Sequence, residues 1–467
     1  MVSGIEGLIK RLKSLEQRII ILERENFALK QENAVLKQEN AKLREENDRL
    51  RERLGLDSRN SSLPPSRDLY KSKAKNRPKS LRRAGAQPGH SPQGYKLHSA
   101  DKVIDVFPEV CSCGHPLERT GKFCVEQKID IPFIKPHVTE YHRWQGLCRR
   151  CGKKKTAPLP EGVQPDLLGE GAKAIISSLS GFFHNSKRDI HQILKDIFHL
   201  PISLGLVSTT EKRVSQRLAV SHQKLIEQME ESPYLHMDET GHKSCGKNGW
   251  GWMFTNRDVS VLKLASSRGK KVLESMLPDY EGWIISDRYG AYRYFDDRKR
   301  QLCWSHLKRD FQRFAQSPHP LLACRGEELA QITKEVFALD KAFKNQSIDR
   351  LFFYRRIRLI KKRMIYALKG ILQIPKIPQA HRVAHNLLAD FDMMWRFVEN
   401  PEVELTNNLA ERQIRKYVIY RKKSLFTWSQ RGNEFIERIF SLYLSCRLQK
   451  QNAFSKLSNL IQIPLHP

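Results

Sequence analysis

Leucine recurs at every seventh position at the start of the chain, and this repeat restricts the possible folds more than any other feature of the sequence. The repeating positions are Leu8, Leu15, Leu22, Leu29, Leu36, Leu43 and Leu50. A sustained seven-residue period of apolar side chains predicts a left-handed coiled coil, here over residues 1–54. A single solvated helix is the alternative, but a lone helix has no use for so regular a row of leucine.

The residues between the leucines indicate how two such helices pair. If leucine occupies heptad position d, asparagine occupies position a at Asn26, Asn33, Asn40 and Asn47. Buried asparagine pairs best with itself in a parallel, in-register dimer. Facing charges also attract in that arrangement, as for Glu25 with Lys30. We therefore expect a homodimer, or a higher oligomer, held by this N-terminal zipper.

The charge of the chain favours a polyanionic partner. Lys and Arg number 82 against 51 Asp and Glu, a formal net charge of +31, and neutralising phosphates releases counterions. Residues 55–100, rich in Pro, Ser, Gly, Lys and Arg, are expected to be a flexible basic linker, which either lies along a DNA backbone or is a solvated tether. Nothing resembles a signal peptide or a membrane span, so we expect a cytoplasmic protein without membrane contact. A merely basic cytosolic protein is the alternative.

Two close pairs of cysteine in residues 101–160 resemble the knuckles of a zinc ribbon. They are Cys111-Ser-Cys113-Gly and Cys148-Arg-Arg-Cys151-Gly. Four thiolates hold Zn²⁺ tetrahedrally in structural sites, so a zinc-ribbon-like module is expected. The first pair is one residue shorter than the second, and His115 or Cys124 can replace one of its ligands. The alternative is a small β-module with reduced cysteines and no metal.

Residues 161–232 show the apolar periodicity of three helices separated by short turns. The helices are expected at Ala172–Phe183, Lys187–Phe198 and Ser203–Met229. Ser203 is expected to cap the N-terminus of the third helix. Helices of this kind form either a helix-turn-helix-like DNA-binding domain, with a recognition helix for the major groove, or ordinary helical packing.

Residues 233–320 alternate between apolar strands and helices in an order that indicates an RNase H-like core. Strands are expected at Tyr234–Asp238, Trp250–Thr255, Val259–Ala265 and Gly282–Asp287, with a helix at Gly269–Leu277. A further strand from Arg300 runs into a helix, at whose start Cys303 and His306 lie three residues apart. Because the first and fourth strands end in Asp238 and Asp287, each is expected to present a carboxylate at the end of a buried strand.

A helical insertion separates the second aspartate from a third acid, Glu411. Helices are expected at Gly326–Lys344, Arg350–Leu372 and Pro378–Glu399. These helices make residues 321–400 the insertion, after which the core resumes over 401–450 and a tail follows over 451–467. The basic run from Arg355 to Arg363 either covers DNA or forms a solvated face. The chain is thus expected to be a multidomain α/β protein whose core is interrupted by an α-helical insertion.

Asp238, Asp287 and Glu411 form an all-oxygen site if the fold brings them together. Carboxylate oxygens suit hard cations such as Mg²⁺ or Mn²⁺, and two such ions clamp the attacking and leaving oxygens of a phosphodiester. The helix that carries the glutamate also carries cations that neutralise phosphates: Arg412, Arg415 and Lys416. The alternative is that all three acids are ordinary solvated carboxylates.

Several short motifs are spread along nearly the whole chain. They are Asn60-Ser-Ser before Pro64-Pro-Ser66, Gln87-Pro-Gly-His90, the paired cysteines, Asp238-Glu-Thr-Gly241, Ser286-Asp287 before Tyr289, Cys303-Trp-Ser-His306-Leu, and Asn407-Asn408 before Glu411-Arg412. Together they resemble the transposases of the IS66 family of bacterial insertion sequences, from the zipper to about residue 450. Where such sequences usually show Ser-Leu-x-x-Thr, this chain has Ser441-Leu-Tyr-Leu-Ser445.

The resemblance implies a DDE transposase with a helical insertion, in which Asp238, Asp287 and Glu411 are the catalytic triad and hold two Mg²⁺ or Mn²⁺ ions. It also implies that Cys303 and His306 form the C-x2-H signature near the site. The implied reaction is metal-dependent cleavage at the ends of an insertion sequence, followed by strand transfer into target DNA. The implied partners are element ends, target DNA and element-encoded helper proteins, met at the nucleoid of the bacterial cytoplasm.

Two other functions remain as alternatives. A metal-dependent nuclease on the same fold would cut DNA without joining it. A DNA-binding relative with a decayed core would bind DNA without cutting it, and its sequence would lack one of the carboxylates. All of Asp238, Asp287 and Glu411 are present.

Overall fold

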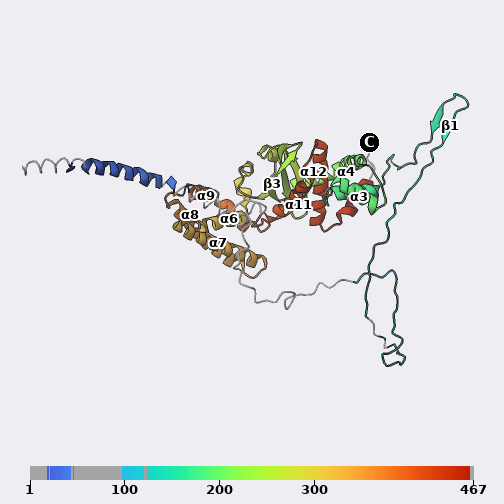
Figure 1. Cartoon of the computed structure of the whole chain (residues 1–467), viewed down its shortest axis with the longest axis horizontal. Helices are drawn as coiled ribbons and strands as arrows, with labels where there is room; N and C mark the ends of the chain where they lie inside the picture. Colours follow the sequence, from blue (N-terminus) through green and yellow to red (C-terminus); the bar gives the residue numbers. More distant parts are fainter. Residues whose placement is uncertain are drawn as a thin grey trace, which may run out of the picture. The chain divides into compact units, whose positions relative to one another are not determined.

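The computed structural model describes residues 18–19, 22–40, 42–43, 46, 97–119, 121, 124–163 and 165–462 (Figure 1). Contacts divide them into two units: a smaller one of residues 97–157 and 191–202, and a larger one of residues 158–190 and 203–462 together with the described part of residues 18–46. Most of the predicted basic linker, residues 55–96, lies outside the described residues. So do Leu8, Leu15 and Leu50 of the heptad repeat.

Residues 22–40 are helical, as the heptad repeat predicts. The apolar side chains of the repeat are 48–59% exposed in the single chain, namely Ile19, Leu22, Leu29, Leu36 and Leu43. The side chains of Asn33 and Asn40 donate back to the carbonyls of Leu29 and Leu36, at 3.1 and 3.2 Å. The apolar side chains of the repeat are therefore half exposed to solvent in the single chain. Their pairing with a second copy stays a prediction.

The smaller unit places each cysteine pair in the turn of an antiparallel hairpin. Strands β1 (Gln145–Leu147) and β2 (Lys154–Thr156) flank the second pair, and a bridge between Val110 and Pro116 flanks the first. Each turn closes through a backbone bond to its first cysteine, from Gly114 to Cys111 and from Gly152 to Cys148, both at 2.8 Å. Both glycines have positive φ, +88° and +68°, a conformation that glycine adopts at no steric cost.

The larger unit is helical at both ends. Before its sheet come α2 (Glu170–Ser180), α3 (Lys187–Asp196), which the two units share, and α4 (Leu204–Glu230); after it come α11 (Asn408–Ser424), α12 (Gln430–Leu448) and α13 (Ala453–Gln462). The N-cap predicted at Ser203 is confirmed, because its Oγ accepts a hydrogen bond from Leu206 N at 3.2 Å. Helix α4 packs against α12, and α2 against α13. A role of α2, α3 and α4 in DNA binding stays a prediction.

A five-stranded sheet positions the site. Its strands are β3 (Tyr234–Ser244), β4 (Lys247–Thr255), β5 (Ser260–Ala265), β6 (Trp283–Ser286) and β7 (Arg300–Leu302), in the spatial order β5-β4-β3-β6-β7. Strands β3, β4 and β5 pair antiparallel, whereas β6 runs parallel to β3 and β7 parallel to β6. Between β5 and β6 lies α5 (Lys271–Met276), and between β6 and β7 lie the 3₁₀ turns η2 (Gly290–Tyr294) and η3 (Asp297–Lys299).

The strand that carries Asp238 is longer than the sequence predicted. We expected it to end at Asp238, but β3 continues to Ser244 because β4 pairs with it from His236 onwards. The parallel pairing with β6 covers only the first three residues of β3. Asp238 therefore lies in the middle of its strand, just beyond the part paired to β6, whereas Asp287 directly follows β6 as predicted.

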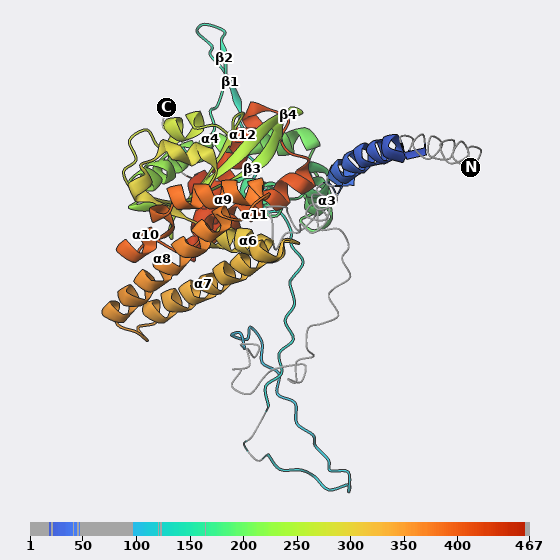
Figure 2. The same ribbon diagram turned by 90° about the vertical axis from the view of Figure 1, so that its left-hand side faces the viewer.

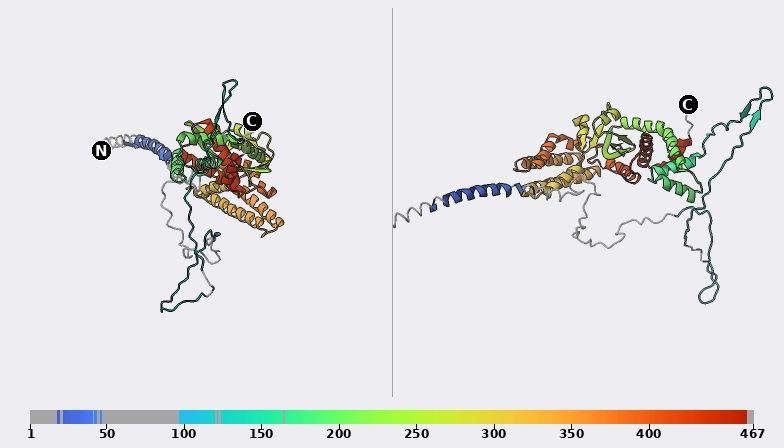
Figure 3. Two further views of the ribbon diagram at one scale, coloured as in Figure 1. Left: turned by 90° about the vertical axis from the view of Figure 1, so that its right-hand side faces the viewer. Right: turned by 45° about the horizontal axis from the view of Figure 1, so that its top comes forward.

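Helices fill the chain between β7 and Glu411. They are α6 (Trp304–Ala315), α7 (Pro320–Lys344), α8 (Arg350–Leu372), α9 (Pro378–Ala389), the 3₁₀ turn η4 (Asp392–Met394) and α10 (Arg396–Glu399). Figures 2 and 3 show α7 and α8 side by side, and α7 also packs against α6. A Cβ atom at Gly326 of α7 would clash with the backbone of Ala315, so this close helix contact requires glycine. No helix in the described part of the chain combines the length and apolar character needed to cross a bilayer.

One helix that the sequence predicted in this region is shorter in the structure. We expected a single helix over Pro378–Glu399, but α9 ends at Ala389 and short helical turns follow. The interruption buries Met394, whose carbonyl accepts hydrogen bonds from the side chains of Gln301 at 3.1 Å and Trp304 at 2.7 Å. These tertiary contacts override the local helical periodicity.

Helix α12 covers the edge of the sheet at β5 and takes the place of a further strand, between the sheet and α4 (Figure 1). Backbone N–H groups of β5 donate to side chains one helical turn apart on α12: Leu264 to Glu437 at 2.7 Å, Leu262 to Ser441 at 3.0 Å and Ser260 to Ser445 at 3.0 Å. An uncovered edge strand leaves such groups unpaired. Ser445 stands where the resembling sequences have threonine, and its hydroxyl makes the bond.

Ser441 gives a direct test of this edge contact. Ser441→Ala leaves the Leu262 N–H buried without an acceptor, so we expect the free energy of unfolding to fall by about 1–3 kcal/mol in chemical denaturation. Ser455→Ala, at an exposed position of α13, is the matched control and should change stability by less than about 0.5 kcal/mol. Equal stability of the two variants would mean that α12 covers the edge through apolar packing alone.

Candidate active site

Asp238, Asp287 and Glu411 come from distant parts of the sequence and lie near one another in the structure. Asp238 is on β3, Asp287 follows β6, and Glu411 is in the first turn of α11. Burial raises the pKa of Asp238 well above its usual value, and the neighbouring carboxylates of Glu239, Asp287 and Glu411 raise it further. Burial also raises the pKa of Glu411, with a contribution from Asp287. The charges of these carboxylates therefore disfavour one another, and a cation near them would be favourable. Their ligand atoms are not gathered within 4.8 Å of one another as those of Cys303, His306 and Glu411 are.

The loop after β6 fixes the carboxylate of Asp287. Its Oδ1 accepts a hydrogen bond from Tyr289 N at 2.8 Å. Burial raises the pKa of Asp287, although this bond and the positive charges of nearby arginines, Arg268 among them, act in the opposite direction. The backbone of its own loop thus holds Asp287 in place.

Glu239 is next to Asp238 but has a different role in the structure. Its side chain is only 2% exposed, and it accepts hydrogen bonds from Arg268 Nη2 at 2.6 Å and from the Tyr292 hydroxyl at 2.5 Å. The Arg268 guanidinium also lies over the rings of Tyr289 and Trp250, at 3.8 and 4.6 Å from their centroids. Glu239 therefore ties β3 to the loops after β5 and β6 and is not free to bind a metal.

Asn407 joins the segments that carry the carboxylates. It is fully buried just before α11, and its Nδ2 donates to the carbonyl of Met237, the neighbour of Asp238, at 2.6 Å. Its backbone N–H donates to Cys303 Sγ at 3.1 Å, and its carbonyl accepts from Glu411 N at 3.2 Å. One residue therefore connects β3, the start of α6 and the first turn of α11.

Asn407 was not predicted to have a role, although Asn407-Asn408 belongs to one of the motifs that carry the family resemblance. Arg309 was not predicted either. It lies on α6, and its charge lowers the pKa of Glu411 against the stronger effect of burial. The pattern carried no signal for these two residues, because each acts through a contact with a distant segment. A buried asparagine just before a helix, as Asn407 is, would have been the available hint.

Cys303 and His306 lie at the start of α6 and close to Glu411. His306 Nδ1 is 3.6 Å from Glu411 Oε1, and neither atom has a hydrogen-bond partner in the described part of the chain. Burial lowers the pKa of His306 to about 3, so at neutral pH the imidazole is uncharged and does not form an ion pair. Burial raises the pKa of Cys303. The candidate ligand atoms of Cys303, His306 and Glu411 all lie within 4.8 Å of one another.

The cations predicted to bind DNA lie along α11. The positive charge of Arg412 lowers the pKa of His236 on β3, after the larger effect of burial. Lys423 and Lys416 lower the pKa of His184, in the turn before α3, in the same direction as burial does. Arg415 is exposed. The helix thus carries its positive charges toward more than one neighbour, and contact with DNA stays a prediction.

The structure does not assemble the two cysteine pairs into one cluster. Among the described residues, the only group of three or more metal-ligating side chains is the one with Cys303, so Cys111, Cys113, Cys148 and Cys151 do not converge. Within each pair, backbone N–H groups point at the first thiol. Those of Cys113 and Cys151 lower the pKa of Cys111 and Cys148 respectively. Each pair therefore has the local turn of a metal knuckle, and a shared zinc ion stays a prediction.

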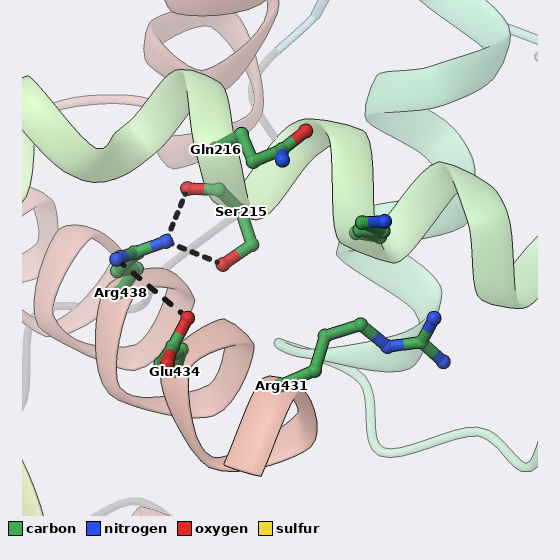
Figure 4. Close-up of a pocket in the computed structure, with 6 residues that line it drawn as sticks. Ser215, Gln216, Arg431, Glu434 and Arg438 are labelled. Carbon is green, nitrogen blue, oxygen red and sulfur yellow. Dashed lines mark hydrogen bonds and ion pairs between the residues drawn. The ribbon is translucent and has the colours of Figure 1, made fainter. Parts of the chain in front are cut away.

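A separate pocket lies between α4 and the start of α12 (Figure 4). Its volume is about 360 Å³, and it is lined by Lys212, Ser215, Gln216, Arg431, Glu434 and Arg438. Arg438 Nη1 donates to the carbonyl and hydroxyl oxygens of Ser215, both at 3.0 Å, and Nη2 lies 3.9 Å from Glu434. With three cations and one acid, the lining is net positive and suits an anion such as a phosphate.

Comparison with known proteins gives three matches. The protein-family model described as "Transposase IS66 family" matches residues 184–435, which include Asp238, Asp287 and Glu411 and make up more than half of the chain. A second model, "Family of unknown function (DUF6444)", matches residues 1–96. The chain is also 21% identical over 431 residues to the "Uncharacterized protein y4jD" of Sinorhizobium fredii, covering 85% of this chain and 81% of that protein.

The raised pKa of Asp238 predicts how its charge affects stability. The unfolded side chain ionises near pH ~3.9, and the folded one at higher pH, so this group destabilises the fold increasingly as pH rises between the two values. We expect Asp238→Asn to raise the melting temperature at neutral pH without divalent metal, and to lose this advantage below the unfolded pKa. Thermal unfolding across a pH series measures it.

Asp279→Asn is the control for that series, because Asp279 is exposed and should show no such gain. Saturating Mg²⁺ should reduce the advantage of Asp238→Asn over the wild type. A variant less stable than the wild type at neutral pH, without metal, would contradict the repulsion between the carboxylates.

The hydrogen bond of the Asn407 side chain leads to a second prediction, about the free energy of unfolding. Asn407→Ala removes the bond to Met237 and leaves that buried carbonyl without this donor, so we expect a loss of about 1–3 kcal/mol in the free energy of unfolding. Asn408→Ala is the neighbouring control. It removes one bond, from Ser305 Oγ at 3.1 Å, at a partly exposed position, and should cost no more than about 1 kcal/mol. Equal losses in chemical denaturation would count against Asn407 as the connecting residue.

Proposed function

The chain belongs to the IS66 family of transposases, and from that premise we propose that it is a DDE transposase. Such an enzyme is a polynucleotidyl transferase that cuts at the ends of an insertion sequence and joins them to target DNA. The observation that supports the proposal is that Asp238, on β3, is buried and feels the charges of Asp287, after β6, and of Glu411, in the first turn of α11. Family membership by itself implies work on DNA, and these carboxylates provide a place for the chemistry.

The strand order supports an RNase H-like catalytic core. In the order β5-β4-β3-β6-β7 the first strand of the sheet is central and lies beside the fourth, so the carboxylates that they carry become neighbours. We assign the core to residues 233–320 and 401–450, with the helical insertion at 321–400 between them. The remaining proposed parts are the zipper at 1–54, the basic linker at 55–100, the zinc-ribbon-like module at 101–160, the helical DNA-binding-like domain at 161–232 and the tail at 451–467.

The chemistry of the donor atoms favours Mg²⁺ or Mn²⁺ as the cofactor. The residues that would hold it are Asp238, Asp287 and Glu411, whose carboxylate oxygens are the ligands that hard cations prefer. Their mutual repulsion is the unfavourable charge that a divalent ion neutralises. Glu239 does not compete, because Arg268 and Tyr292 already hold its carboxylate. When bound, two such ions activate the attacking oxygen and stabilise the leaving one.

The proposed reaction has two steps. In the first, a water oxygen bonds to the phosphorus at the element end, the bond to the 3′ oxygen breaks, and that oxygen takes up a proton. In the second, the freed 3′-hydroxyl loses its proton and attacks a target phosphodiester, whose own 3′ oxygen leaves. No Tyr or Ser nucleophile is needed, because no covalent bond forms between protein and DNA.

The cations of α11 and α6 would hold the DNA backbone during both steps. We assign Arg412, Arg415 and Lys416 to contacts with phosphates, and Arg309 to the phosphate nearest Glu411. Arg412 and Arg309 are supported by the electrostatic effects that they exert on His236 and Glu411, respectively. Such contacts neutralise phosphate charge without reading the base sequence.

The assembly we propose is a dimer bound to DNA. The half-exposed leucine row of the N-terminal helix is the surface that a second copy would cover, and pairing would bring one core to each element end. Cys111, Cys113, Cys148 and Cys151 would bind a structural Zn²⁺, which the turn geometry of each pair supports. We also propose that element-encoded helper proteins take part, and that the reaction takes place at the nucleoid of the bacterial cytoplasm.

A strand-transfer assay tests the proposed function. Purified protein, Mg²⁺ and a labelled duplex carrying the element end should yield that end covalently joined to a target plasmid. Asp287→Asn should reduce joining to background, because it removes one carboxylate of the group, whereas Asp279→Asn, at an exposed position, should retain it. Joining that persists in Asp287→Asn would refute the assignment of this residue.

The same assay separates the alternatives. Cleavage without joined product favours a metal-dependent nuclease on the same fold. Binding of the element end without any cleavage, even with the neighbouring element-encoded proteins added, favours a DNA-binding relative whose catalysis has decayed.

A further inference from the structure

The start of α6 brings a sulfur and a nitrogen ligand to the edge of the carboxylate group. Cys303 immediately precedes α6 and His306 is in its first turn. Together with Glu411 of α11 they offer Sγ, an imidazole nitrogen and a carboxylate oxygen, all within 4.8 Å of one another. This set differs in kind from the all-oxygen group of Asp238, Asp287 and Glu411, because a thiolate and an imidazole select softer cations.

The two polar atoms of this cluster have no other use in the described part of the chain. His306 Nδ1 and Glu411 Oε1 are buried and lack hydrogen-bond partners, although they lie only 3.6 Å apart. Buried polar atoms are almost always satisfied, and these two are positioned to share one partner. A cation between them would satisfy both at once.

Cys303 has the surroundings of a metal ligand as well. Its Sγ accepts a hydrogen bond from the Asn407 backbone N–H at 3.1 Å, and the side chain is 1% exposed. Partners of this kind orient the ligands of metal sites. The same asparagine accepts from the backbone N–H of Glu411 through its carbonyl, so it fixes the positions of two of the three ligands relative to each other.

We propose that Cys303, His306 and Glu411 form a binding site for one thiophilic divalent cation of the Zn²⁺ class, separate from the cysteine pairs of residues 101–160. Three protein ligands of mixed type leave the fourth tetrahedral position open, as in zinc sites that keep a water or other exchangeable ligand. Binding at this site does not depend on the transposase reaction.

The site has a regulatory consequence, which does rest on the proposed function. Glu411 belongs both to this cluster and to the carboxylate group that would hold Mg²⁺. A Zn²⁺ ion bound by Cys303 and His306 would draw Glu411 away from Asp238 and Asp287. Zinc would therefore inhibit the Mg²⁺-dependent reaction by competing for one shared carboxylate.

Cobalt titration of the full chain tests the binding site directly. Co²⁺ replaces Zn²⁺ at such sites, and thiolate ligation gives it an intense charge-transfer absorption. The cysteine pairs would contribute to that absorption, so the wild type is compared with Cys303→Ser. We expect the variant to bind one Co²⁺ fewer per chain and to lose the corresponding part of the absorption. An unchanged stoichiometry and spectrum in Cys303→Ser would overturn the proposal.

Two more variants guard against an effect of misfolding. Cys446→Ser changes another buried cysteine, on α12, and should titrate as the wild type does. His306→Gln keeps the thiol and should weaken Co²⁺ binding at this site by roughly tenfold or more, since even partners outside the ligand set change affinity by that much. Wild-type affinity in a folded His306→Gln protein would remove His306, and with it the three-ligand site, from the proposal.

Zinc inhibition of strand transfer tests the consequence separately. With Mg²⁺ fixed, Zn²⁺ should abolish joining by the wild type at the same concentration at which it displaces Co²⁺ from the Cys303-dependent site. Joining that continues with that site saturated would refute the competition for Glu411. If Co²⁺ binds as expected but no condition gives joining, the metal site stands and the proposed transposase function fails.

Discussion

A single buried amide holds together the segments on which the whole site depends. The carboxylates of Asp287 and Glu411 disfavour the charge of Asp238, so the segments that carry them must be anchored by other contacts. Asn407 provides these anchors through its side chain to β3, its N–H to Cys303 and its carbonyl to the first turn of α11. Because each bond involves a buried group, releasing any one of them leaves an unsatisfied polar atom. The contacts of Asn407 therefore make the structure rigid close to the carboxylates that repel one another.

The sheet behind the site is stabilised in an unusual way at its free edge. Side chains of Glu437, Ser441 and Ser445 repeat once per helical turn, and the N–H groups that they bind repeat every second residue of β5. Four residues of helix rise about 6 Å, and two residues of strand about 6.6 Å, so the two spacings nearly match. A helix can then substitute for a strand over this length, and the end of the chain becomes part of the core that carries Asp238.

The sequence was informative where structure follows from local pattern, and less so where it follows from distant pairing. The cap at Ser203 could be predicted because a serine stands directly before a helical segment, and the strand before Asp287 because Trp283, Ile284 and Ile285 form a short apolar run. The extension of β3 beyond Asp238 could not be predicted, because it depends on the pairing of β3 with β4. The helix break after Ala389 follows from burial of Met394 against Gln301 and Trp304. The carboxylates were recognisable as candidates from motif and position, whereas nothing local marked Arg309 or the contacts of Asn407.

The path of the chain around the helical insertion has a consequence for how such proteins diversify. Trp304 N, at the start of α6, donates to the Leu405 carbonyl at 3.1 Å, so the chain returns from the helical insertion of residues 321–400 to a point beside the start of α6. The entropy of closing a loop grows only slowly with its length. Segments of very different size could therefore be exchanged at this junction during evolution while the carboxylates keep their places. The helical insertion can therefore differ in size between relatives without moving Asp238, Asp287 or Glu411.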